Sequence, residues 1–492
     1  MNVLLIYPEF PDTFWSFKHA LEFVGKRSAL PPLGLLTVAA MLPKEWSLRL
    51  VDTNVKGLSD QDLKWADCAF VSAMGIQREP ARRIIKRCKE AGLRIVAGGP
   101  LFNIEHDQFK DVDHFILNEA ELTLPPFLED FGKGRPGKIY SSEKFADLNQ
   151  TPQPMWKLLD IRRYATMSIQ FSRGCPFNCD FCNITSLLGK HVRIKTPAQI
   201  TAELDGLYSI GWRGDMFFVD DNFIGNKQFL KTDLLPALIE WRKGKKGNVF
   251  HTEASLNLAD DQPLMDMMVE AGFTKVFVGI ETPDASCLAE CGKAQNRNRD
   301  LVEDVKRIHR AGLQVQGGFI VGFDHDLPSI FQRQIDFIQK SGIVTAMVGL
   351  LQAPPGTKLY ERMEKEGRLC APSSGDNMDG TTNIIPAMSM AKLKEGYRRI
   401  LDEIYAPEHY YSRMRTFLRD YKAPKVRRTF QFSHVMAAVR SVYRIGILGR
   451  ERYQYWKMIF WTLFRYPGLV REAIILSVYG YHFRKVCESH VV

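Results

Sequence analysis

A short loop with three cysteines constrains this chain more than any other stretch. The loop spans residues 173–182, reads Arg-Gly-Cys-Pro-Phe-Asn-Cys-Asp-Phe-Cys, and places its thiols at Cys175, Cys179 and Cys182. Because Gly, Pro and Asn disfavour an amphipathic helix here, the loop can curl its thiols around one centre. Thiolates are the ligands that iron–sulfur clusters require, and three of them leave one iron of a 4Fe–4S cluster open.

Two plainer interpretations of the loop stay open, a zinc site and a set of three structural thiols. Zinc would need a fourth ligand nearby, and His191, nine residues beyond Cys182, is the only candidate close in sequence. The count of available ligands therefore favours the iron–sulfur cluster.

The pattern Cys-x-x-x-Cys-x-Phe-Cys resembles the radical S-adenosylmethionine (SAM) superfamily. This resemblance implies that SAM chelates the open iron through its amino and carboxylate groups. It also implies that an electron from the cluster cleaves SAM into methionine and a 5′-deoxyadenosyl radical, with Phe181 near the adenine. A protein electron donor such as flavodoxin or ferredoxin is then expected.

Size and composition limit the classes of protein to which the chain can belong. The chain has 492 residues, enough for two or three domains. Nine cysteines, only three of them in a tight motif, and the lack of a signal peptide favour a reducing cytoplasm. The net charge is +10, and residues 401–492 carry 16 Lys and Arg against 7 Asp and Glu, so +9 of that charge lies in the last fifth.

Residues 1–140 alternate between predicted strands and helices. Strands are predicted at 3–7, 47–52, 68–72 and 94–97, and helices at 33–42 and 79–91. This alternation predicts an α/β domain with a parallel, Rossmann-like sheet whose ligands lie at the strand C-termini.

Several segments of this domain resemble the cobalamin-binding domain of cobalamin-dependent radical SAM enzymes. They are Pro31-Pro32-Leu33-Gly34-Leu35, Asp52-Thr53-Asn54 and Gly98-Gly99-Pro100, with Leu117-Asn118-Glu119 where that family often has Gly-Glu. The resemblance implies cobalamin at the strand ends that hold Ser72, Met74, Gly98, Gly99 and Pro100. No Asp-x-His-x-x-Gly motif occurs, so we expect no histidine ligand on cobalt. A domain that serves only as a substrate platform stays open.

A linker at 141–165 leads to six strand–helix steps at 166–370, which predict a partial (β/α)6 barrel of the TIM type. Polar residues stand at its predicted strand ends, namely Asp220, Asp221, Glu253 and Glu281. Their carboxylates could accept hydrogen bonds from the SAM amino group and ribose hydroxyls, and Gly318 would let backbone atoms reach the adenine. One of the two aspartates could instead cap a helix. No pair of residues suggests a general acid and base, so the catalytic residues stay unknown.

Residues 371–492 predict a basic helical C-terminal region. Its apolar run at 459–464 is bounded by charges and a proline and is too short to span a membrane. A basic aromatic face could touch a membrane or an acidic partner, although a solvated helical cap fits equally. We expect peripheral contact with the inner membrane face and a cavity walled by tail aromatics. These are Trp456, Phe460, Trp461 and Phe464, with Arg452 and Arg465 nearer to water.

Short matches along residues 1–370 resemble the branch that contains the hopanoid 2-methylases. Examples are Ser168–Ser172, Val219–Asn226 and Gly279–Pro283. The resemblance implies a methyltransferase in which methylcobalamin supplies the methyl group and a second SAM remethylates the cobalt. It identifies the branch better than the substrate, but the aromatic walls expected from the tail suit an apolar acceptor such as an isoprenoid or hopanoid lipid.

Two other functions stay open. One is a non-methylating radical SAM enzyme that forms rings, rearranges or couples its substrate, and the other is an RNA-modifying radical SAM enzyme. The N-terminal domain lacks a second three-cysteine cluster and the tail lacks a β-rich RNA-binding pattern, which argues against nucleic acid as a partner.

Overall fold

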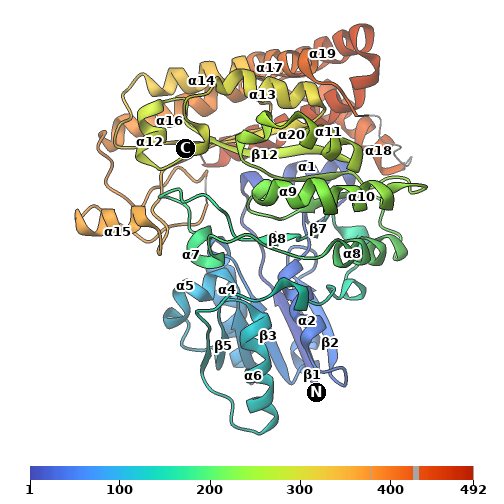
Figure 1. Ribbon diagram of the computed structural model, residues 1–492, viewed down its shortest axis with the longest axis vertical. Helices are drawn as coiled ribbons and strands as arrows, with labels where there is room; N and C mark the ends of the chain where they lie inside the picture. Colours follow the sequence, from blue (N-terminus) through green and yellow to red (C-terminus); the bar gives the residue numbers. More distant parts are fainter. Residues whose placement is uncertain (377, 425–431, 491–492) are drawn as a thin grey trace.

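Three regions follow one another along the long axis of the molecule (Figure 1). The computed structural model describes residues 1–376, 378–424 and 432–490. The N-terminal sheet lies at one end, the strands of a second sheet occupy the middle, and the C-terminal helices, orange to red, lie at the other end.

The N-terminal region is a six-stranded parallel sheet in the order β2-β1-β3-β4-β5-β6. The strands are β1 Asn2–Tyr7, β2 Ser47–Asp52, β3 Cys68–Ser72, β4 Arg94–Gly98, β5 His114–Ile116 and β6 Ile139–Tyr140. The connecting helices are α2 Leu33–Met41, α3 Asp60–Trp65, α4 Arg78–Glu90, α5 Pro100–Glu105 and α6 Ala120–Gly132. Alternate strand residues enter two separate cores, so both faces of the sheet are covered. The doubly wound, Rossmann-like domain is confirmed.

The middle region is a second parallel sheet, with the order β14-β13-β12-β11-β10-β7. Its strands are β7 Thr166–Ile169, β10 Asp215–Phe218, β11 Phe250–Glu253, β12 Phe273–Glu281, β13 Gln314–Val321 and β14 Ala346–Leu350. The larger helices are α8 Pro197–Ser209, α10 Leu235–Arg242, α11 Gln262–Ala271, α13 Leu301–Ala311 and α14 Ile330–Ser341. Two shorter helices, α12 Ala285–Glu290 and α15 Lys358–Lys365, follow β12 and β14. Because β7 and β14 are edges that do not pair with each other, the barrel is partial, as expected.

A small antiparallel pair frames the cysteine loop. Strand β7, the first of the barrel, stops at Ile169, and the chain then forms β8 Ser172–Arg173, which pairs with β9 Arg193–Ile194. The cysteines and the short helix α7 Ile184–Leu188 lie between these two strands. The loop is thus tied at both ends.

The C-terminal helices pack directly on the barrel. They are α16 Met390–Tyr405, α17 Pro407–Asp420, α18 Phe432–Ser441, the π-helix η11 Val442–Ile447, α19 Arg452–Arg465 and α20 Val470–His490. One continuous hydrophobic core joins the barrel strands to Tyr405, Phe417 and Phe483. No helix among the described ranges is both long enough and apolar enough to cross a membrane.

Helix α19 corrects one expectation about the tail. Phe460 and Phe464 were expected to wall a substrate cavity, but their side chains are 51% and 83% exposed. The helix buries its opposite face, through Tyr455 and Met458, against the rest of the tail. The tail region that does approach the interior is α20.

A segment near the start of the chain meets the last helix, α20, beside the barrel. The turn η1 Phe14–Ser16 and helix α1 Lys18–Val24 lie against α20. The rings of Phe14 and Phe483 stack with their centroids 4.1 Å apart, and His482 Nε2 lies 3.0 Å from the Phe14 carbonyl oxygen. The turn η1, helix α1 and helix α20 therefore share one packing unit.

Candidate active site

The three thiols of the cysteine loop stand at the C-terminal end of β7. Cys175, Cys179 and Cys182 are unbridged and half-buried. Gly174 has φ +94°, and a Cβ there would lie 2.7 Å from the His191 carbonyl oxygen and 2.9 Å from that of Gly189. Only glycine lets the loop close this tightly against the strand that follows it.

A buried lysine that sequence reasoning missed stands next to these thiols. Lys293 Nζ lies 2.7 Å from Glu281 Oε1 and 6.0 Å from the centroid of the Phe181 ring. Burial alone would lower the pKa of Lys293, but the negative charges of Glu281 and Cys179 raise it. Burial also raises the pKa of the Cys182 thiol to about 12, while Lys293 pulls it down. Lys293 thus places a positive charge beside the cysteine thiols, which must ionise to bind iron.

Asp220 lies underneath the cysteine loop. Its two carboxylate oxygens accept hydrogen bonds from the backbone of Phe171 and Ser172, and the Ser172 hydroxyl donates a third at 2.6 Å. The side chain is fully buried. Its oxygens therefore hold the turn between β7 and β8 against the end of β10, and its expected contact with SAM stays a prediction.

Asp221 and Glu253 stand at the ends of β10 and β11 and keep part of their surface accessible. Burial raises the pKa of Asp221 to about 6. Burial, followed by repulsion from Asp221 and Asp220, raises the pKa of Glu253 to about 8. The Asp221 charge also raises the pKa of Cys175. The carboxyl groups of Asp221 and Glu253 therefore disfavour their charged forms at this part of the barrel mouth.

Glu281 ends β12 in a left-handed conformation with φ +65°, which is costly for a residue with a side chain. Its carboxylate is paired with Lys293, and its carbonyl accepts a hydrogen bond from Gln334 Nε2 at 3.2 Å. Gly318 stands on the adjacent strand, where a Cβ would lie 2.8 Å from the Phe277 ring. The glycine makes room for that ring.

The expected cobalamin residues lie together at the C-terminal edge of the N-terminal sheet, beside the β1–β3 switch in strand order. Gly99 has φ +96°, and a Cβ there would lie 2.8 Å from Ser72 Oγ. A Cβ on Gly98 would lie 2.8 Å from the Ile116 carbonyl oxygen, and Pro100 begins α5. Met74 is 47% exposed, and the Gly75 backbone has open space above it.

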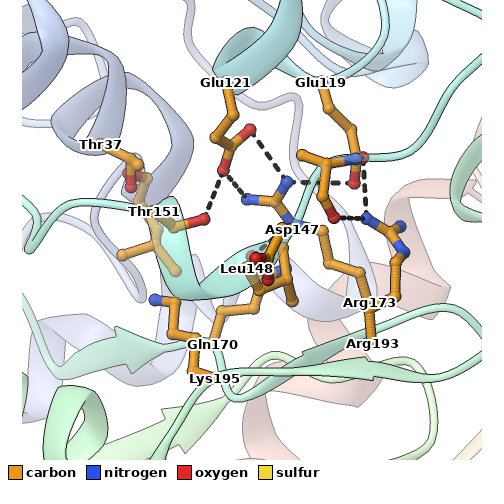
Figure 2. Close-up of polar contacts among 12 residues, drawn as sticks. Thr37, Glu119, Glu121, Asp147, Leu148, Thr151, Gln170, Arg173, Arg193 and Lys195 are labelled. Carbon is orange, nitrogen blue, oxygen red and sulfur yellow. Dashed lines mark hydrogen bonds and ion pairs between the residues drawn. The ribbon is translucent and has the colours of Figure 1, made fainter.

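An interdomain ion cluster joins this domain to the cysteine loop (Figure 2). It consists of Glu119, Glu121, Arg173 and Arg193. Arg173 lies 3.1 Å from Glu119 and 2.8 Å from Glu121, and Arg193 lies 2.8 Å from Glu119. Both glutamates come from the start of α6, and both arginines come from the strands that frame the loop. The position of Glu119 was noted in the sequence, but its partners were not.

The comparisons with known proteins agree with this geometry. The radical SAM superfamily model matches residues 169–338, and a domain of unknown function (DUF4070) matches residues 357–491. An uncharacterized methyltransferase of Synechocystis sp. is 40% identical, with 98% of this chain and 91% of that protein covered. The hopanoid C-2 methylase of Rhodopseudomonas palustris is 32% identical, with 98% and 92% covered. The chain belongs to the cobalamin-dependent radical SAM enzymes, in the branch that contains the hopanoid 2-methylases.

Solved structures support the same fold for this cobalamin-dependent radical SAM enzyme. The radical enzyme OxsB with aqua-cobalamin bound aligns with a TM-score of 0.63 at 14% identity, covering 100% of this chain and 84% of OxsB. The methyltransferase TsrM from Kitasatospora setae, with cobalamin and a 4Fe–4S cluster bound, gives 0.62 at 14% identity, covering 96% and 99%. The radical SAM domain implies a 4Fe–4S cluster and SAM, and both of these structural neighbours have cobalamin bound.

The residues present fit these groups. No set of three or more His, Cys, Asp or Glu side chains converges on a single ion within the described residues. A 4Fe–4S cluster binds its three thiolates through three different irons, so the donor set is suitable without such convergence. Asp221 and Glu253 offer carboxyl groups that can hydrogen-bond the amino group and ribose hydroxyls of SAM. The exposed Met74 leaves part of this edge open to cobalamin, while the loop at Gly375 packs against the backbone of Gly75 and Ile76 on one side of it.

The inner face of the barrel sheet is aromatic. Phe217 and His251 stack at 4.9 Å, and burial lowers the pKa of His251 to about 3, so this ring is neutral. Trp15 arrives from the N-terminal domain, packs edge-on against Phe277 at 5.1 Å and directs its Nε1 to Met347 Sδ at 3.0 Å. The N-terminal domain thus contributes directly to the interior of the barrel.

Proposed function

We propose that this enzyme transfers a methyl group to an unactivated carbon of an apolar lipid of the isoprenoid or hopanoid class. The observation that carries the proposal is the relationship to the hopanoid C-2 methylase over nearly the whole of both chains. The relative at 40% identity, also named a methyltransferase, supports the reaction type but names no substrate.

The residues around the cysteine loop have separate roles in this proposal. Cys175, Cys179 and Cys182 hold the cluster, and the Lys293 charge offsets the negative charge that collects there. Asp221 and Glu253 hydrogen-bond the amino group and ribose hydroxyls of SAM, while Asp220 holds the loop from below. When bound, the cluster and SAM supply a hydrogen-abstracting radical and cobalamin supplies the methyl group. The residues of the chain bind, orient and shield these groups.

The substrate site in this proposal lies between the N-terminal sheet edge and the barrel mouth. Hydrogen abstraction from a C–H bond requires no general acid or base, and none is paired here for that purpose. What the site must do is exclude water from the radical and hold a bulky apolar molecule in place. Trp15, Phe277 and Met347 offer the apolar walls for both tasks.

A lipid acceptor resides in a bilayer, so we also propose peripheral association with the inner face of the cytoplasmic membrane. The concentration of positive charge in residues 401–492 favours contact with anionic headgroups. The electrons for SAM cleavage come, in this proposal, from a soluble donor such as flavodoxin or ferredoxin.

The test is turnover by the anaerobically reconstituted enzyme with cobalamin, reduced flavodoxin as the electron donor, methyl-deuterated SAM and a hopanoid in detergent. We expect the deuterated methyl group in the hopanoid product, and no transfer by Cys182→Ala. Formation of 5′-deoxyadenosine with a changed but unlabelled product would instead identify a non-methylating enzyme. Comparison of the lipids and metabolites of a deletion strain with its parent covers other acceptors. Loss of a methylated polar metabolite, with all lipids unchanged, would overturn the lipid assignment and leave methyl transfer standing.

A further inference from the structure

The exposed apolar residues of this enzyme are concentrated in the tail. Among the described residues, nine of the eighteen large apolar side chains that are exposed lie between residues 435 and 464. They are Val435, Val439, Tyr443, Ile447, Leu448, Tyr453, Phe460, Leu463 and Phe464. Scattered exposed apolar residues are normal, but such a concentration marks an interaction surface.

Helix α19 arranges its share of these residues as a stripe. Tyr453, Phe460 and Phe464 are spaced by seven and four residues, so they lie on one face of the helix. Trp456 joins them, with its ring stacked on Phe460 at 5.6 Å and its indole N–H donating to the Gly446 carbonyl oxygen at 2.9 Å. The opposite face of α19 is buried. The stripe is therefore additional to the apolar face that the fold itself needs.

Positive charge surrounds the stripe. Arg450, Arg452, Lys457 and Arg465 are exposed, and Lys457 Nζ lies 5.9 Å above the Tyr453 ring. Between residues 432 and 470 the sequence contains one acidic residue, Glu451, which is buried and paired with Arg484. The surface as presented to solvent is thus aromatic and cationic.

We propose that the outward face of α19, with the preceding turn at Ile447 and Leu448, is a docking surface for an anionic lipid bilayer. The docking residues are Ile447, Leu448, Tyr453, Phe460 and Phe464, with the four exposed cations around them. Aromatic rings insert at the level of the headgroups, while the arginines and the lysine face the lipid phosphates. The proposal deepens the proposed function and rests on it, because the docked bilayer would be the source of the lipid acceptor.

A second copy of the chain is a poorer occupant for this face. A two-fold interface places the same patch on both sides. It would therefore bring the cations of two copies together, with no exposed acid in this segment to neutralise them. An anionic bilayer supplies the missing charge and accepts the aromatic rings at the same time.

Flotation of the purified full-length enzyme with vesicles tests the surface without any methyl acceptor present. We expect binding to vesicles of phosphatidylglycerol and phosphatidylcholine, weaker binding at high salt, and little binding to phosphatidylcholine alone. The double substitution Phe460→Ser and Phe464→Ser should weaken binding at least about tenfold. Replacing Arg450 and Arg452 with Gln should weaken it about twenty-five-fold, since each cation contributes about a fivefold factor.

Matched controls separate docking from folding. Leu327→Ser removes an apolar side chain that is 69% exposed on the barrel and should leave vesicle binding unchanged. The tail variants should retain the melting temperature and iron content of the wild type, because the altered side chains are exposed. Their methyl transfer to a detergent-solubilised acceptor should also persist. Binding of the double Phe variant equal to that of wild type would overturn the proposal. So would a wild-type dimer that this variant dissociates, since it would assign the face to a second copy. Docking without lipid methylation would overturn the proposed function alone.

Discussion

The interdomain ion cluster predicts a large and specific effect of the substitution Glu121→Gln. Glu121 lies 2.8 Å from Arg173 and accepts a hydrogen bond from the Thr151 hydroxyl at 2.7 Å. The glutamate side chain is 7% exposed and the arginine 13%. Gln keeps the shape of the side chain and removes its charge, so Arg173 remains buried with one carboxylate fewer.

The magnitude follows from this burial. Removing one partner of a buried ion pair costs about 3–5 kcal/mol, because the other charge is left uncompensated. Arg173 still has Glu119 at 3.1 Å, so we expect the lower end, about 3 kcal/mol. At about 2–4 °C per kcal/mol for a large domain, the melting temperature should fall by roughly 6–12 °C.

The assay is thermal unfolding of the cluster-free protein at several pH values, with Glu129→Gln as the control. Glu129 lies on the same helix and pairs with Lys133 at the surface, where an ion pair contributes at most about 1 kcal/mol. Burial alone would raise the pKa of Glu121, but the hydrogen bonds and charge of Arg173 lower it overall. Its contribution is therefore present at neutral pH and is lost as the pH falls through this lowered pKa. Equal melting of both variants at pH 7 would refute the reasoning.

Three further predictions concern the cofactor sites. Replacing Cys175, Cys179 or Cys182 with Ala should abolish 5′-deoxyadenosine formation and reduce the iron content from about four per chain, and continued SAM cleavage by any of these variants contradicts the assignment. The raised pKa of Glu253, about 8, means that the cluster-free protein should lose stability as the pH rises from about 4.5 to 8, since the folded state holds a proton that the unfolded state releases. Glu253→Gln should remove much of this slope in a pH series of melting temperatures, and an unchanged slope counts against the burial of the carboxyl. Met74→Arg should lower the cobalamin content of purified protein without changing its melting temperature, because the side chain is exposed at the sheet edge. A bulky residue at Gly99 tests the site less well, since its Cβ would meet Ser72 even without cobalamin.

Local patterns in the sequence were sufficient for the architecture. Both parallel sheets, the partial barrel and the position of the cysteine loop follow from strand–helix alternation and residue spacing, and the comparisons confirm the family. Contacts between distant segments could not be predicted in this way. Lys293 reaches the thiols only because β12 returns the chain to the barrel mouth, and Arg173 meets Glu119 across 54 residues.

The sequence did not show that neighbouring residues of the same type take different positions in the structure. Asp220 and Asp221 are neighbours, yet one lies under the loop and the other stands at the barrel mouth. Helix α19 has apolar residues on two faces, and sequence alone does not say which face is buried. The aromatics expected at a cavity wall are, in part, those that face the solvent.

The stacking of Phe14 on Phe483 also has a consequence for how the enzyme is made. The strands of the N-terminal sheet leave the ribosome within the first 140 residues, but the turn at Phe14 finds its partner only when α20, the last helix, has been synthesised. Contacts between the two ends of a chain form slowly and leave apolar surface exposed meanwhile. Until α20 has been synthesised, the side of the barrel that Phe14, α1 and α20 close together stays uncovered, so the nascent chain keeps apolar surface in contact with water.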